Sequence, residues 1–170
     1  MEYEILFGKE AEKFSEQCGK IFDDNNKDYI VNRDGIFDHK KFKLLVLNID
    51  GETLAYQLIY IGGDFVKQET YDDAFNQGFK YENDAVYIWD MCTKKGFENK
   101  GYQQALIKFL IGNYPIKNIY SLTDIDNKNS MSLQEKLGFT SIGNFVGHHG
   151  ETYAVLKKPK TKEDIDILSH

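Results

Sequence analysis

The sequence predicts a mixed α/β fold in which helices pack on both faces of one twisted sheet. Two observations lead to this prediction. Apolar residues follow helical spacing at residues 9–23, whereas short apolar runs bounded by turn residues indicate strands. In addition, an apolar strand at 86–93 leads through a glycine-bearing turn directly into a helix at 102–113. The expected element order is helix, hairpin, strand, helix, strand, helix, hairpin.

The first half of the chain is expected to form a helix and a hairpin. Strands at 42–49 and 53–61 would pair across Asp50-Gly51, a dipeptide favoured in two-residue hairpin turns. A polar, acidic stretch with several tyrosines follows, and a short helix is expected in it at 69–76. The helix at 9–23 would bury one face, made of Ala11, Phe14, Cys18, Ile21 and Phe22.

The second half is expected to continue with a strand at 118–123, a helix and a final hairpin. Asn127 or Asn129 would cap that helix, and Gly138 would end it in a left-handed conformation. The hairpin would pair 142–146 with 153–156 across His148-His149-Gly150. The helix at 102–113 ends before Pro115, and its inward residues would be Ala105, Leu106, Phe109 and Leu110.

Length and composition predict one domain over 1–158 and a charged, frayed tail over 159–170. A hydrophobic fraction of 41% excludes a disordered chain. The sequence has no apolar run of about 20 residues and begins without a signal-peptide pattern, so a cytoplasmic location is expected. Cys18 and Cys92 are expected to be reduced thiols. A net charge of -6 disfavours nucleic acid and acidic membrane surfaces as partners.

The strand, the turn and the helix start suggest a seat for a phosphate group. The first backbone N–H groups of a helix lack partners within the helix, and the helix dipole favours an anion there. Gly101 stands at the end of this turn, immediately before the helix. A second helical segment at 127–139 closes with Leu137-Gly138-Phe139.

These two segments together resemble the GNAT superfamily of acyl-CoA-dependent N-acetyltransferases. The resemblance covers roughly residues 40–156 in element order and 86–139 in motif residues. The first motif corresponds to Glu98-Asn99-Lys100-Gly101-Tyr102-Gln103. The second motif corresponds to Asn127, Ser130, Leu133, Gln134, Lys136, Gly138 and Phe139.

The resemblance implies a mostly antiparallel sheet whose fourth and fifth strands are parallel and splay at one end. It also implies acetyl-CoA as cosubstrate. No metal is expected, because no Cys, Asp or His stands at ligand spacing. A backbone N–H of Met91, Cys92 or Thr93 would polarise the thioester carbonyl, and Asn127 would bind the cofactor arm or cap its own helix. The residues that the resemblance assigns to the pyrophosphate are Glu98, Asn99, Lys100, Gly101, Tyr102, Gln103 and Gln104.

Three residues depart from the family pattern. Glu98 places a carboxylate where arginine or glutamine is usual, although Lys100 offsets its charge. Gln103 replaces a small residue and would occupy space near the phosphates. Gln134 replaces the tyrosine that protonates the departing thiolate in many relatives, and an amide cannot act as that acid.

Asp90 and Tyr87 are the candidate catalytic residues. An aspartate within an apolar strand needs a partner, which would be a cationic substrate or an internal lysine or amide. Tyr87 matches a position at which some relatives keep a base, with strand packing as the alternative. Three further sets of residues are candidates. His148 and His149 would relay a proton or simply form an exposed turn, and Cys92 would carry the acyl group or be a small buried residue. Four tyrosines would pack singly or together line an acceptor cleft: Tyr56, Tyr60, Tyr71 and Tyr81.

The predicted function is transfer of an acetyl group from acetyl-CoA to a primary amine, directly and within a ternary complex. The acceptor is expected to be an amine-bearing small molecule or peptide, with a cationic acceptor and a homodimer left open. Two alternatives remain. One is a GNAT-like module that binds acyl-CoA without catalysis. The other is an unrelated α/β nucleotide-binding protein that uses the same glycine turn.

Overall fold

The structure is a computed structural model that describes residues 2–26, 42–61 and 69–160. The chain divides into two compact units, Met1–Ile59 with Trp89–Asn113, and Tyr60–Ile88 with Tyr114–His170. Strand β4 (Ala85–Thr93) begins in the second unit and ends in the first. The single domain expected over 1–158 stays a prediction. Most of the expected tail lies outside the described residues.

The first unit is built on antiparallel strands. Strand β2 (Lys43–Ile49) pairs with β1 (Glu4–Phe7) on one side and with β3 (Glu52–Ile61) on the other. The β2–β3 turn has positive φ at Asp50 (51°) and Gly51 (79°), as a tight hairpin of this kind requires. The predicted hairpin is confirmed, whereas β1 was not predicted. Its four residues are too few to show a strand pattern.

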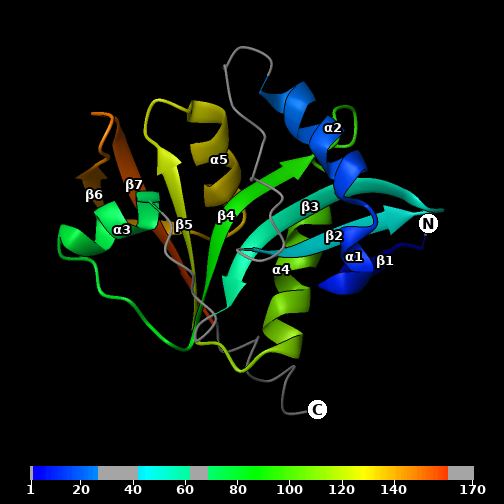
Figure 1. Ribbon diagram of the computed structural model, residues 1–170, viewed down its shortest axis with the longest axis horizontal. Coiled ribbons are helices and arrows are strands. Elements are labelled where there is room, and N and C mark those ends of the chain that lie inside the picture. Colours follow the sequence, from blue (N-terminus) through cyan, green and yellow to red (C-terminus); the bar gives the residue numbers. More distant parts are fainter. Residues whose placement is uncertain (1, 27–41, 62–68, 161–170) are drawn as a thin grey trace. The chain divides into compact units, whose positions relative to one another are not determined.

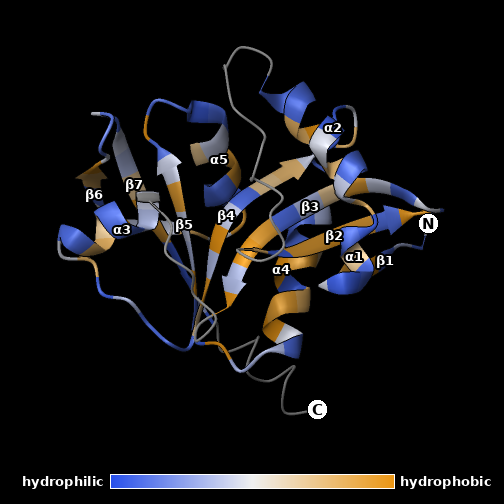
Figure 2. Cartoon of the chain, viewed as in Figure 1, coloured by the Kyte–Doolittle hydropathy of each residue, from blue (hydrophilic) through white to orange (hydrophobic). Residues whose placement is uncertain are grey.

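Helices cover both faces of this first sheet segment. Residues 44–49 and 53–59 are buried without alternation, so neither face of β2 or β3 meets solvent. Helix α1 (Lys9–Glu12) packs on β1 and β2, and α4 (Tyr102–Asn113) also packs on β2. Figure 1 shows α1 in front of the strands and α4 behind them. Hydrophobic residues follow β2 and α4 in Figure 2.

Two predictions about these helices were wrong in detail. The helix expected at 9–23 is split, because α1 ends at Glu12 and α2 (Ser15–Asn25) begins after Phe14. The side-chain hydroxyl of Ser15 donates to the carbonyl of Glu12 (2.6 Å) at this break. Ala11, Cys18, Ile21 and Phe22 are buried as predicted, but Phe14 is only half-buried.

The buried face of α4 is rotated from the predicted one. Ala105 and Phe109 are half-buried, although they were expected to point inward. The first buried position is a glutamine, which an apolar pattern does not count. The residues of α4 that are buried are Gln103, Leu106, Ile107, Leu110 and Ile111.

The second unit combines one parallel and two antiparallel strand pairs. Strand β5 (Asn118–Asp124) pairs in parallel with the first four residues of β4, through Ile88 and Ser121. It also pairs with β7 (Thr152–Pro159), which in turn pairs with β6 (Thr140–Val146). The outer strand on this side is therefore β6. A mixed sheet with a parallel β4–β5 pair confirms the predicted fold class.

Two helices accompany these strands. Helix α3 (Glu69–Asn76) has the predicted bounds, and α5 (Lys128–Lys136) follows β5. The side chain of Asn127 accepts from the backbone N–H of Ser130 (3.1 Å), and Gly138 has a φ of 94°, so the predicted cap and stop of α5 are confirmed.

Helix α3 is tied to the end of β6. The side-chain amide of Gln77 donates to the carbonyl of Val146 (2.6 Å) and accepts from its N–H (3.1 Å). The Asp73 carboxylate contacts both the backbone N–H (2.9 Å) and the ring Nδ1 (2.7 Å) of His148.

Within residues 2–26, 42–61 and 69–160, no helix is long and apolar enough to cross a membrane.

Candidate active site

The turn between β4 and α4 leaves an open space in front of a helix start. Lys94 still belongs to the sheet, since its N–H donates to the carbonyl of Leu54 (2.7 Å). Gly96, Asn99 and Gly101 then take positive φ values of 92°, 62° and 80°. An atom added at Cβ of Gly101 would meet no other atom within 4 Å. The space beside Gly101, at the start of α4, is therefore unfilled, as a phosphate seat at a helix start requires.

Glu98 interacts with its own turn. One carboxylate oxygen of Glu98 accepts from the N–H of Gly96 (2.8 Å), so this residue helps to shape the loop. Lys100 follows two positions later and is exposed. The turn thus carries both signs of charge, as the sequence indicated.

Gln103 does not lie where the sequence predicted. Its side chain is buried, and its amide nitrogen donates to the carbonyl of Cys92 (2.8 Å) and to the hydroxyl of Thr93 (3.2 Å). Its amide oxygen accepts from Nε2 of Gln57 (3.0 Å). Because the side chain points into the sheet, the expectation that it fills phosphate space was wrong.

The end of β4 is held from two sides by side-chain amides. Gln103 of α4 binds the carbonyl of Cys92, and Asn25 of α2 donates to the carbonyl of Thr93 (3.2 Å). Consecutive amides of a strand point to opposite edges. Since the N–H of Lys94 points toward β3, the N–H of Thr93 points away from it.

Asp90 and Cys92, both half-buried, form a cluster with the buried Tyr56. The hydroxyl of Tyr56 donates to Oδ2 of Asp90 (2.5 Å). The thiol sulfur of Cys92 lies 3.8 Å and 3.9 Å from the two carboxylate oxygens. The partner of Asp90 is therefore a tyrosine hydroxyl, whereas a lysine, an amide or a cationic substrate was expected.

The surroundings of this cluster shift its ionisation. Burial raises the pKa of Asp90 above its ordinary value, and the hydrogen bonds from Tyr56, Cys92 and the Met91 backbone partly offset that rise. Burial also raises the pKa values of Tyr56 and Cys92 well above their usual ranges. The hydroxyl and the thiol therefore stay protonated at neutral pH, and Asp90 is the group of the cluster that can exchange a proton.

Cys18 and Cys92 are both free thiols. Burial raises the pKa of Cys18 to about 12, so it is also protonated at neutral pH. A protonated thiol is a weak nucleophile, which favours the packing interpretation of Cys92 over acyl transfer.

Tyr87, the second catalytic candidate, packs within the second unit. Its hydroxyl accepts from the backbone N–H of Glu82 (2.8 Å), and its ring stacks with those of Tyr81 and Tyr120 at 5.6 Å and 5.3 Å. Burial raises the pKa of Tyr87 to about 12. These contacts are those of the strand-packing alternative.

The tyrosines proposed for an acceptor cleft have different surroundings. Tyr56 belongs to the Asp90 cluster of the first unit. In the second unit, Tyr71 packs edge-on against Tyr60 (6.3 Å), and Tyr81 stacks on Tyr87. Tyr71 is the only one of the four that lines the cavity described below.

The remaining candidates make local contacts. Gln134 is buried and donates to the hydroxyl of Thr123, which ties α5 to β5. Asn127 caps α5. His148 binds Asp73 and lies 4.0 Å from the ring of His149. Among the residues that the structure describes, no group of three His, Cys, Asp or Glu side chains could hold a metal ion.

Sequence reasoning missed Gln57, and it named Tyr56 only for packing or an acceptor cleft and not as the partner of Asp90. Tyr56 and Gln57 lie on β3, 34 residues before Asp90 and 46 residues before Gln103, respectively. No local motif connects such distant positions. The one available signal was Asp90 itself, because a carboxylate in an apolar strand requires a partner.

The chain matches the family model described as the acetyltransferase (GNAT) family over residues 8–139. No curated protein sequence matches it. Among solved structures, it is similar to an aminoglycoside acetyltransferase in complex with coenzyme A and kanamycin (TM-score 0.68, 11% identity, 99% of this chain and 100% of that one).

Two bacterial proteins of known organism show the same fold similarity. One is a GNAT-family acetyltransferase from Streptococcus agalactiae, with a TM-score of 0.65, 19% identity and coverage of 94% of this chain and 96% of that one. The other is a putative acetyltransferase from Salmonella typhimurium with acetyl-CoA, with a TM-score of 0.59, 15% identity and coverage of 95% and 96%. At such identities the similarity shows the fold alone.

Proposed function

We propose, because the chain belongs to the GNAT acetyltransferase family, that it transfers an acetyl group from acetyl-CoA to a primary amine. The observation that carries the proposal is the open turn at Gly101, which lies directly before the start of α4, where the first N–H groups of a helix have no partner within the helix. Acetyl-CoA supplies both an anionic pyrophosphate for such a seat and an activated acetyl group.

The turn residues would bind the pyrophosphate through their backbone. The amides of residues 99–104 surround the start of α4, and Gly101 allows close approach because it has no side chain. The helix dipole adds a partial positive charge at this point. Glu98 contributes to loop shape, while Lys100 supplies a positive charge.

The thioester carbonyl needs a hydrogen-bond donor at the end of β4. The N–H of Thr93 is the best placed of the three amides considered, since it points away from β3. The amide of Met91 already acts on Asp90, and the carbonyls of Cys92 and Thr93 are held by Gln103 and Asn25. These side-chain amides would fix the strand end and so preorganise the donor.

Asp90 would accept the proton of the acceptor amine, directly or through one water. A primary amine has a pKa near about 10.4 and is mostly protonated at neutral pH, so a base is needed before attack. Burial raises the pKa of Asp90, which makes its carboxylate a stronger base than an exposed one. Tyr56 holds the carboxylate in position.

The departing thiolate would need little help. A free thiol has a pKa near about 8.5, so a thiolate is a reasonable leaving group near neutral pH. Gln134 stands where relatives carry an acid, but its buried amide binds Thr123. The raised pKa of the Cys92 thiol supports direct transfer in a ternary complex, with no acetylated enzyme.

The test is release of free CoA from acetyl-CoA in the presence of pooled primary amines. Wild-type protein should release CoA only when an amine is present, and Asp90→Asn should lower kcat by about 10²–10³. Asp126→Asn, an exposed position, is the matched control and should keep the wild-type rate.

Two results would contradict the proposal. If CoA binds and no amine promotes its release, the chain is an acyl-CoA-binding module. An undiminished rate in Asp90→Asn would remove Asp90 as the base while leaving the transfer activity in place.

A further inference from the structure

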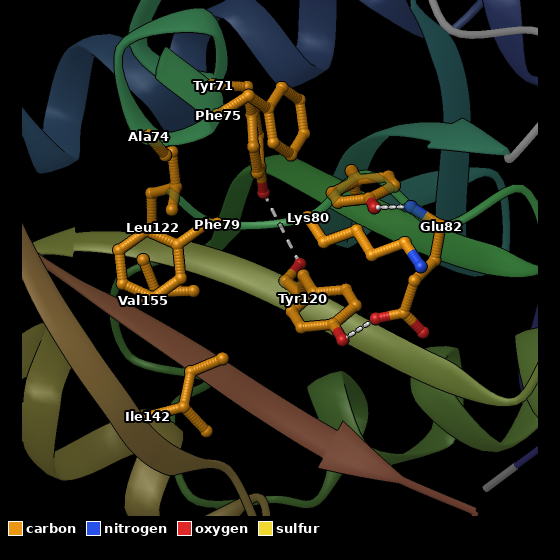
Figure 3. A pocket seen from close by; sticks show the side chains of 11 residues that line it. Tyr71, Ala74, Phe75, Phe79, Lys80, Glu82, Tyr120, Leu122, Ile142 and Val155 are labelled. Atoms are coloured by element: carbon orange, nitrogen blue, oxygen red, sulfur yellow. Dashed lines mark hydrogen bonds between the residues drawn. The ribbon is translucent and has the colours of Figure 1, made fainter. Parts of the chain in front are cut away.

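The second unit contains a cavity that the proposed function does not use. It has a volume of about 190 Å³ and is lined by side chains from α3, the segment after it and strands β4 to β7. We call it the aromatic cavity. The rings that line it are those of Tyr71, Phe75, Phe79, Tyr87 and Tyr120 (Figure 3).

The tyrosine hydroxyls of the aromatic cavity are bound to protein atoms. Tyr71 donates to the carbonyl of Ile88 (2.5 Å), Tyr87 accepts from the N–H of Glu82 (2.8 Å), and Tyr120 donates to the Glu82 carboxylate. Each of these hydroxyls therefore already has a protein partner. The walls present mainly ring and aliphatic carbon to an occupant, which favours an apolar body.

Two charged residues also line the aromatic cavity, and they differ in their contacts. Both carboxylate oxygens of Glu82 accept hydrogen bonds, one from Nδ2 of Asn118 (2.6 Å) and one from Tyr120. Lys80 is exposed, and the described residues provide it with no ion pair. The charge that is available to an occupant is therefore the positive one.

The size of the aromatic cavity limits the occupant to one ring. An engineered cavity of about 150 Å³ in another protein binds benzene, so 190 Å³ accommodates a six-membered ring with a short substituent. The wall residue Ile142 is 47% exposed, which places part of the wall at the surface and gives a ligand a route of entry.

We infer that the aromatic cavity binds a small carboxylate with a single-ring or branched aliphatic body. The apolar part would pack among the rings, and the carboxylate would pair with Lys80. This binding site stands independently of the proposed acetyl transfer, since it uses neither the Gly101 turn nor the Asp90 cluster.

The experiment compares three probes of the same shape on the full chain. Phenylacetate, phenylacetamide and benzylamine are titrated while backbone amide signals are followed by NMR. Phenylacetate should bind with a dissociation constant on the order of 0.1–1 mM. The neutral amide should bind at least fivefold more weakly, and the amine more weakly still.

Variants locate the binding. Lys80→Met keeps the aliphatic stem and should weaken phenylacetate at least fivefold without changing phenylacetamide. Lys108→Met, an exposed lysine of α4, is the matched control and should change neither. Ile142→Trp should fill the aromatic cavity from its exposed wall and abolish binding of both probes, with a melting temperature close to wild type.

The inference is overturned if benzylamine binds most tightly, which would indicate an organic-cation site at Glu82. Equal affinities for phenylacetate and phenylacetamide would remove the role of Lys80. Two further results would show that the site does not exist. One is unchanged phenylacetate binding in Ile142→Trp, and the other is no binding of any probe at a concentration 20-fold above the expected dissociation constant.

Discussion

The two units of the chain use their buried polar groups in opposite ways. In the first unit, Gln103 binds the carbonyl of Cys92 and Asp90 binds the hydroxyl of Tyr56, close to a turn that is open at Gly101. In the second unit, the hydroxyls of Tyr71 and Tyr87 bind backbone groups, and their rings line a cavity. The site in the first unit therefore presents polar groups to a ligand, whereas the cavity in the second unit presents mainly ring and aliphatic carbon atoms.

This difference indicates what each unit can do. A site that polarises a carbonyl or moves a proton needs fixed donors and a carboxylate, which the first unit has. A site that retains an apolar ligand needs walls whose hydroxyl groups are already hydrogen-bonded, which the second unit has. Substitutions matched between the units therefore test the assignment.

The largest expected effect is at the glycine turn. Gly101→Glu would place a side chain and a negative charge at the phosphate seat, and CoA affinity should fall more than 100-fold in calorimetry. Gly78→Glu in the second unit is the matched control, because both glycines have positive φ (80° and 106°) and open space at Cβ. Equal losses in the two variants would attribute the effect to backbone strain.

The next effect concerns the pH dependence of activity. Tyr56→Phe removes a hydrogen bond that lowers the pKa of Asp90, so that pKa should rise further. Asp90 would then be deprotonated only at higher pH, and the acidic limb of kcat/KM should move up by about one pH unit. Tyr87→Phe should leave that limb in place. If the acidic limb of the kcat/KM profile does not move in Tyr56→Phe, the group that titrates there is not Asp90.

A smaller effect is expected on stability from two buried glutamines. Gln103→Leu would leave the Cys92 carbonyl and the Gln57 amide without their partner, at a cost of about 2 kcal/mol in the free energy of unfolding. Gln134→Leu should cost less than about 1 kcal/mol. It loses one bond to Thr123, and the Gln134 amide oxygen is already buried without a partner among the described residues. Urea denaturation of both variants measures these losses in the free energy of unfolding. A larger loss in Gln134→Leu than in Gln103→Leu would contradict the prediction.

The smallest effect is expected at the exposed contact between Asp73 and His148. The hydrogen bond from His148 lowers the pKa of Asp73, so Asp73 stabilises the fold above its ordinary pKa of 3.8. That stabilisation should be lost as the pH falls below this value toward the lowered one. Wild type and Asp73→Asn should differ slightly in urea midpoint at pH 6 and converge near pH 3. A difference that grows with acidity would contradict the sign.

The sequence predicted the elements that have strong local signals. Asp50-Gly51 fixed the first hairpin, and the glycine turn with Pro115 bounded α4 on both sides. The cap at Asn127 and the stop at Gly138 likewise depend on a few adjacent residues. Such signals act within one turn of chain, so they can be read without the tertiary structure.

The remaining features depend on distant partners. The break at Phe14, the short strand β1 and the burial of Gln103 follow from packing, which periodicity does not contain. Asp90 was identified from its apolar neighbours, but its partner Tyr56 was not, because only the fold brings β3 beside it. The aromatic cavity was not predicted for the same reason: its rings come from α3 and from strands far apart in the sequence.

The two hydrogen bonds between the Gln77 side chain and the Val146 backbone have a consequence for self-association. The outer strand β6 carries exposed Ile142 and Val146, and an outer strand can recruit a strand from another molecule through its open backbone groups. The Gln77 amide occupies both backbone groups of Val146 and so imitates a neighbouring strand at that position. Gln77, the residue after helix α3, thereby closes the last residue of β6 to edge-to-edge aggregation.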